Sequence, residues 1–177
     1  MSTSSLEWRR WLPAAGHAQL WQRVLVTPAD PASAVARIAL GAMILPHGMQ
    51  KALGWFGGAG FEGAMTFFTE TMGMPWLVSV SVVGAEFLGG LALLVGLGGR
   101  IAAAGVGAVM VGAALTTHVQ HGFFMNWFGA LPAGSEGWEF HLLATALAAI
   151  VVIRGSGSIS LDRLLAGPDD SSGLRVR

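Results

Sequence analysis

The sequence predicts an all-α integral membrane protein: a transmembrane four-helix bundle with an amphipathic N-terminal interfacial helix. Two observations carry this prediction. Hydrophobic residues fill 53% of the 177 positions and charged residues only 11%, whereas soluble domains average about 25% charged residues. A soluble fold with so few charges would expose large apolar patches, so most of the surface is expected to face lipid.

Four apolar stretches define the predicted spans, at about residues 33–53, 76–97, 101–120 and 138–153. About 20 residues, at ~1.5 Å each, cross a hydrocarbon core roughly 30 Å thick. The fourth stretch is therefore short unless Arg154 snorkels to the interface. Residues 33–162 are predicted to form one four-span domain. A cytoplasmic amphipathic segment, residues 1–32, precedes it, and a flexible cytoplasmic tail, residues 163–177, follows it.

The distribution of cations predicts the orientation in the membrane. Arginines precede the first span, occupy the turn between the second and third spans, and follow the fourth span, whereas Lys51 is the one cation on the opposite side. The positive-inside rule then places both termini in the cytoplasm and the longer loops, residues 54–75 and 122–137, outside. The expected location is the inner (plasma) membrane, crossed several times.

Charge and cysteine content exclude several classes of function. The formal net charge is zero and no basic stripe is present, which argues against nucleic acid as a partner. The absence of cysteine excludes disulfides and thiolate metal ligands within this chain. The lipid bilayer is the expected partner, while self-association to a homo-oligomer and a soluble or membrane redox partner protein are left open.

Ionisable residues inside the predicted spans indicate a polar site. Glu86 lies near the middle of the second span, and Gly89 and Gly90 share its helical face, so a neighbouring helix can approach it closely. An ionisable side chain at such a depth costs ~2.5–3.5 kcal/mol on insertion scales, and a partner is therefore expected. The first span offers His47 and Lys51, four residues apart near its outer end.

The third and fourth spans add further polar side chains at the same level. His118 and His121 end the third span, and Glu139 and His141 open the fourth, pointing about 160° apart on a helix, so at most one of these two faces the bundle centre. We take as candidate catalytic residues Glu86, His47, Lys51 and His118. Candidate cofactor-binding residues are His118, His121, Glu139 and Arg37. No metal site is predicted, because only His118 and His121 have ligand spacing and no carboxylate shares their motif.

Three interpretations of this cluster stay open at the level of residue chemistry. It could hydrogen-bond a quinone headgroup and relay its protons, it could hold a metal or haem, or it could be a structural polar knot that ties the helices together.

The same residues carry a resemblance to a known family. Three stretches resemble the DoxX family of small four-span membrane proteins. They are the stretch from Arg37 to Gly54 with its Pro46-His47-Gly48 sequence, the run Gly84-Ala-Glu-Phe-Leu-Gly-Gly90 followed by Arg100, and the ending Gly155-Ser-Gly-Ser-Ile-Ser-Leu-Asp162. The resemblance covers about residues 37–162. It singles out Arg37, His47, Lys51, Glu86, Arg100, His118, Glu139 and Asp162, whereas His121 and His141 depart from the family pattern.

The resemblance implies a role in redox chemistry. DoxX-like proteins are associated with a thiosulfate:quinone oxidoreductase and with membrane-anchored redox or detoxification complexes. By that resemblance the chain is expected to be a membrane subunit of an oxidoreductase system, with quinone as the candidate cofactor. The alternatives are a non-enzymatic anchor for a soluble partner enzyme and a small proton-coupled transporter, and whether the chain is itself an enzyme is left open.

Overall fold

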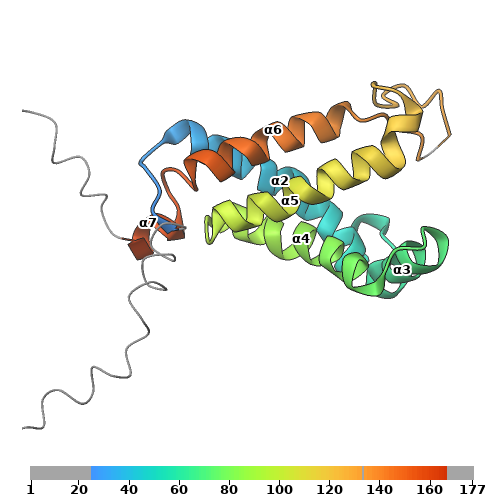
Figure 1. The fold of residues 1–177 in the computed structure, drawn as a ribbon, viewed down its shortest axis with the longest axis horizontal. Helices are drawn as coiled ribbons and strands as arrows, with labels where there is room; N and C mark the ends of the chain where they lie inside the picture. The colour runs from blue at the N-terminus through green and yellow to red at the C-terminus, as the bar shows by residue number, and fades with distance from the viewer. Residues whose placement is uncertain (1–24, 133, 167–177) are drawn as a thin grey trace, which may run out of the picture.

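The computed structural model describes residues 25–132 and 134–166, and within these ranges every regular element is a helix. Four main helices run side by side along the long axis of the molecule: α2 (Pro31–Leu53), α4 (Trp76–Val95), α5 (Gly99–Ala113) and α6 (Glu139–Arg154) (Figure 1). Most of the predicted amphipathic N-terminal segment, up to residue 24, lies outside the described residues. The expected all-α fold is confirmed for the described part of the chain.

Three of the main helices are long and apolar enough to cross a membrane. α2 and α4 have 23 and 20 residues, and α5 continues through the π-helical η4 (Ala114–His118) and the 3₁₀ turn η5 (Val119–His121) to a rod of 23 residues. α6 has 16 residues and falls short of that length. Three predicted spans are thus matched by helices of spanning length, and the fourth span stays a prediction.

The alternating direction of the helices gives the molecule two distinct ends. We call the end that holds Pro31, Val95, Gly99 and Arg154 the arginine end, and the end that holds Leu53, Trp76, His121 and Glu139 the histidine end. Asp30 starts α2 by accepting a hydrogen bond from the Ala32 N–H at 3.0 Å, with Pro31 in the first turn. Gly54 ends α2 in the left-handed region, at φ 73°.

One core joins all four main helices. Its buried side chains come from every one of them: Leu40 and Ile44 from α2, Leu93 from α4, Val106 and Met110 from α5, and Ala144, Ala148 and Val151 from α6. Many of these side chains are small, as is usual where close packing rather than water exclusion holds helices together in lipid.

α2 and α4 approach each other most closely at glycines. A Cβ on Gly48 would lie 2.5 Å from both the backbone nitrogen and the Cα of Phe87, and one on Gly90 would lie 3.0 Å from the Cα of Leu45. Gly84, by contrast, has nothing within 4 Å of where its Cβ would be. Close approach at Gly48 and Gly90 lets side chains further along α2 reach the middle of α4.

The segments that connect the helices are more ordered than the sequence analysis expected. The predicted loop 54–75 contains the 3₁₀ turn η2 (Trp55–Gly57), the helix α3 (Gly60–Thr66) and the π-helical η3 (Phe67–Thr71). The predicted flexible tail begins at residue 163, yet α7 (Leu161–Ala166) covers its first four positions.

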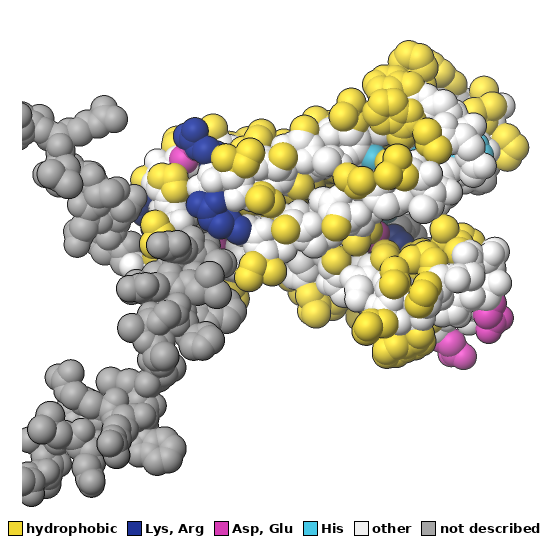
Figure 2. Space-filling view, viewed as in Figure 1, with side chains coloured by type: hydrophobic (Ala, Val, Ile, Leu, Met, Phe, Trp, Pro, Cys, Tyr) yellow, Lys and Arg dark blue, Asp and Glu magenta, His cyan; other side chains and the backbone are white. Residues whose placement is uncertain are grey.

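The bundle is closed at the arginine end and opens at the histidine end. α4 and α5 meet at the turn Gly96–Gly98 and diverge from there (Figure 1). Figure 2 shows the surface hollowed between the α3 region and the segment that joins α5 to α6, with basic and acidic side chains at the base of the hollow.

Candidate functional site

An ion pair between α2 and α4 lies at the histidine end. The Nζ of Lys51 is 2.6 Å from the Oε2 of Glu86, and the side chains are 28% and 5% exposed, respectively. Lys51 follows Gly48 by one turn, and the contact of Gly48 with Phe87 brings the lysine within reach of Glu86. The carboxylate thus has a charged hydrogen-bonding partner, and the ammonium remains open to the hollow on one side.

His47 lies one turn before Lys51 and is exposed. It shares the face of α2 with Leu40 and Ile44, both 0% exposed in the core. Side chains on this face of α2 therefore change from buried at Ile44 to exposed at His47 within one turn, because α4 and α5 have diverged at this level. The imidazole packs edge-on against Phe140 of α6, with ring centroids 5.8 Å apart.

A pair of histidines from α5 and α6 lies beyond Phe140. The rings of His118 and His141 are 4.1 Å apart between centroids and tilted by 37°, and the ring of Phe140 is 5.5 Å from that of His141. His118 ends the π-helical η4, and such a π-turn at the end of a helix commonly marks a functional position.

The hydrogen bonds of this pair assign one tautomer and leave one atom unpaired. The Nδ1 of His118 is 2.8 Å from the backbone oxygen of Glu136. A carbonyl only accepts, so Nδ1 carries the proton and the Nε2 of neutral His118 keeps a free lone pair. His141 is 7% exposed, and its Nδ1 is buried without a hydrogen-bond partner among the described residues. Such an orphaned atom is uncommon in a purely structural network.

His141 is a site residue that the sequence analysis did not select. The opposition of Glu139 and His141 allowed only one of them to face inward, and His141 is that one. Glu139 is partly exposed and accepts a hydrogen bond from the Nε1 of Trp127 at 2.6 Å. His121 lines a separate, shallow cavity of about 300 Å³ formed by residues 121–131. Both residues thus serve the segment between α5 and α6 in this structure.

The structure does not bring Arg37 to the histidine end. Arg37 is fully buried at the arginine end, where its guanidinium donates to the backbone oxygens of Leu93, Leu94, Ser156 and Ile159. The last carbonyls of α4 have no partner within the helix, and Arg37 supplies donors to them. Ten residues separate Arg37 from His47 along α2, about 15 Å at 1.5 Å per residue, and this distance keeps Arg37 away from the predicted cofactor-binding residues at the histidine end.

Asp162 completes the polar network at the arginine end. It is 1% exposed, and its carboxylate accepts from the N–H groups of Gly98 and Gly99, at 2.6 and 3.0 Å, and from the Oγ of Ser156, at 2.5 Å. It therefore caps the start of α5 and balances the charge of Arg37 through Ser156. Arg100 donates in the same manner to the backbone oxygens of Val152 and Ile153 at the end of α6.

The chemistry open to the two ends differs accordingly. At the arginine end Arg37 and Asp162 are buried and hydrogen-bonded to backbone groups, and the Nε of Arg100 is buried without a partner among the described residues. At the histidine end an ammonium, a carboxylate and three imidazoles come from neighbouring helices, and His47 is exposed whereas His141 is buried. Within the described residues, the Nδ1 of His141 has no hydrogen-bond partner. Such groups can bind an anionic or hydrogen-bond-accepting headgroup and exchange protons with it. Among residues 25–132 and 134–166, no three histidine, aspartate or glutamate side chains are grouped to hold a metal ion.

These features define an all-helical membrane protein with a polar site at one end of its spans. The DoxX family model matches residues 32–119, and the chain belongs to the DoxX family. The matched region contains Arg37, His47, Lys51, Glu86, Arg100 and His118, whereas α6 and α7 lie beyond it. No curated protein matches the chain, and no solved structure matches it.

Proposed function

We propose that the chain is an integral membrane subunit of an oxidoreductase or redox-detoxification system, with a polar site in the outer leaflet that handles a quinone headgroup or its protons. The observation that carries the proposal is the ion pair of Lys51 and Glu86, in which the lysine side chain is 28% exposed and lies one turn beyond an exposed His47. Charges kept at this depth in a span are characteristic of ligand or proton sites.

The proposed topology has four spans and cytoplasmic termini. α6 belongs to the same core as α2, α4 and α5, and a helix of 16 residues is about 24 Å long. Trp138 at its start and Arg154 at its end, the latter with a side chain 60% exposed, are suited to the two interfaces and lengthen the effective span. The positive-inside rule then directs the histidine end outward.

Each side chain at the site has a proposed role. Lys51 offsets negative charge on the headgroup, and Glu86 and His47 exchange protons with it. The free lone pair of His118 Nε2 accepts a further proton or hydrogen bond. A quinone would supply carbonyl oxygens that accept hydrogen bonds and take up protons on reduction, and donors of the Lys51 and His47 type fit such oxygens.

Polar atoms without hydrogen-bond partners favour a binding site over a cluster that only holds the helices together. A knot that only holds helices together is stable when each buried polar atom has a partner. Here the Nδ1 of His141 has none among the described residues, and the ammonium of Lys51 is partly open to the hollow. The ammonium of Lys51 is therefore open to a ligand, whereas the Nδ1 of His141 is buried.

The proposal is tested by mass analysis of an organic extract of the detergent-purified full-length protein, together with quinone reduction by membranes that contain its partners. The wild type is expected to retain quinone, and Glu86→Gln and His118→Ala are expected to lose most of it. Glu62→Gln, which changes an exposed carboxylate on α3, is the matched control and should retain it. If Glu86→Gln and His118→Ala fold and keep full retention and partner activity, the site proposal is wrong and a non-enzymatic anchor becomes the better account.

A further inference from the structure

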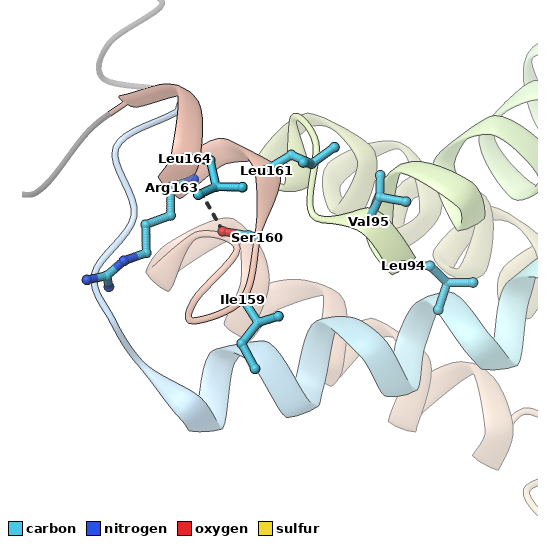
Figure 3. Close-up of a pocket in the computed structure, with 7 residues that line it drawn as sticks. All are labelled: Leu94, Val95, Ile159, Ser160, Leu161, Arg163 and Leu164. Atoms are coloured by element: carbon cyan, nitrogen blue, oxygen red, sulfur yellow. Dashed lines mark hydrogen bonds between the residues drawn. The ribbon is translucent and has the colours of Figure 1, made fainter.

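A groove lies at the arginine end of the described part of the chain, far from the histidine site. It has a volume of about 750 Å³ and lies between the end of α4 and the segment that leads into α7. Its apolar lining consists of Leu94, Val95, Ile159, Leu161 and Leu164, and Arg163 stands at its edge (Figure 3).

The lining is continuous with the surface of α4 that faces outward from the bundle. Leu88 and Val95 on α4 are 63% and 49% exposed, and Ile159 and Leu164 beside them are 87% and 78% exposed. Such a strip of large apolar side chains is not stable against water, and on α4 it is the surface expected to contact lipid tails. The groove extends that surface around the end of the span.

Ile159 is held in this position at the expense of backbone strain. Its φ is 54°, in the left-handed region that β-branched residues rarely adopt. Its carbonyl accepts a hydrogen bond from Arg37 at 2.9 Å, so the buried guanidinium fixes the backbone while the side chain stands out into the groove. Backbone strain of this kind is often found at ligand sites.

The charge at the groove is positive. Among the described residues no carboxylate lies within ion-pair distance of Arg163, because the nearby acids are already engaged: Asp162 with α5 and Ser156, and Asp30 with Arg154. Figure 3 shows the guanidinium of Arg163 extending beyond the apolar side chains rather than into the groove. An occupant with an apolar body and an anionic head at its rim matches this arrangement.

We propose that this groove binds an anionic phospholipid of the adjoining leaflet, with one acyl chain along Leu94, Ile159 and Leu164 and the phosphate on Arg163. The apolar part of the proposal follows from the continuity with the lipid-facing side of α4. Its charged part follows from the Arg163 guanidinium, which has no ion-pair partner among residues 25–132 and 134–166. The lipid would cover the strained Ile159 and hold α7 against the end of α4. This inference is independent of the proposed redox function.

The proposal is tested on full-length protein in nanodiscs that contain equal amounts of phosphatidylglycerol and phosphatidylcholine. Native mass spectrometry after release into mild detergent counts the retained lipids. The wild type is expected to retain phosphatidylglycerol at least fivefold over phosphatidylcholine. Arg163→Gln should abolish the preference between lipids, and Leu164→Ser should lower the retention of both.

Leu165→Ser is the matched control, because Leu165 is 66% exposed on the same helix but does not line the groove. It should retain lipid as the wild type does. Equal retention by all variants, or no phosphatidylglycerol preference in the wild type, would overturn the proposal. A photo-crosslinking probe placed at position 159 provides a second test. Crosslinks to residues 1–24 of the same chain instead of to lipid would also overturn the proposal.

Discussion

Replacing Arg37 with methionine is expected to be among the most destabilising single changes in this protein. The guanidinium is 0% exposed and donates to Ser156 at 2.8 Å and to Leu94 and Ile159 at 2.9 Å, in addition to Leu93. Methionine keeps much of the stem volume but none of the donors. Each lost hydrogen bond to a charged group is worth about 1.5–3 kcal/mol, and leaves a buried carbonyl unpaired.

The net effect is smaller than the sum of these bonds, because the folded protein no longer bears the desolvation of a buried charge. Removing one partner from a buried charged network typically lowers the free energy of unfolding by about 3–5 kcal/mol, and we expect that range for Arg37→Met. Arg37→Lys should recover less than half of the loss, since a single ammonium cannot reach carbonyls on two separate elements.

The assay is reversible unfolding in mixed micelles, followed by far-ultraviolet circular dichroism as the fraction of denaturing detergent rises. The matched control is Arg154→Met at the same end of the molecule. Arg154 pairs with Asp30 at 2.9 Å, but its side chain is 60% exposed, so its loss should amount to less than about 1 kcal/mol. Equal effects of Arg37→Met and Arg154→Met would refute the assignment of Arg37 as a buried cap of α4.

Two further predictions concern helix packing and pH. Gly48→Ala should lower the free energy of unfolding by about 1–3 kcal/mol, because the new methyl group would meet the backbone of Phe87. Gly84→Ala should be neutral or slightly stabilising, because nothing lies near its Cβ position. The same unfolding assay in micelles measures both variants, and a neutral Gly48→Ala would contradict the close approach of α2 and α4. Burial of Asp30 favours its protonated form, but hydrogen bonds from Ala32 and Arg154 outweigh this and lower the pKa below 3.8. The stabilisation by Asp30 is therefore full above its unfolded pKa and is lost as the pH falls through the lower folded value. The difference in melting temperature between wild type and Asp30→Asn at pH 7 should therefore shrink as the pH falls below 3.8. A difference that stays constant or grows over that range would count against this assignment.

The helices could be predicted from the sequence because their signals are local. Apolar length located the three helices of spanning length, and Asp30-Pro31 and Gly96 match ordinary rules for where helices start and end. α3 was missed because it has only seven residues and two of them, Gly60 and Gly63, are glycines, which disfavour helices. Gly48 was not singled out either, because a glycine's packing role depends on which helix faces it, and this is a property of the assembled bundle.

The candidate site was predicted in part, for a related reason. The positions of Lys51 and Glu86 in their spans predicted that the two side chains could pair, and they do, since both residues lie on regular helices. The role of Arg37 could not be predicted from spacing, because its position along α2 decides that it binds the carbonyls at the arginine end. His141 could have been found from its opposition to Glu139, but the choice between those two needed the hydrogen bond of Glu139 to Trp127.

The most direct test of the account exchanges the charges of its central pair. In the double variant Lys51→Glu/Glu86→Lys the ion pair is kept and its direction is reversed. If the pair forms part of a binding site, the exchange restores unfolding stability to within about 1 kcal/mol of the wild type, while quinone retention and partner activity stay as low as in either single variant. Recovery of stability, retention and activity together would contradict the account, and would leave Lys51 and Glu86 as a structural tie between α2 and α4.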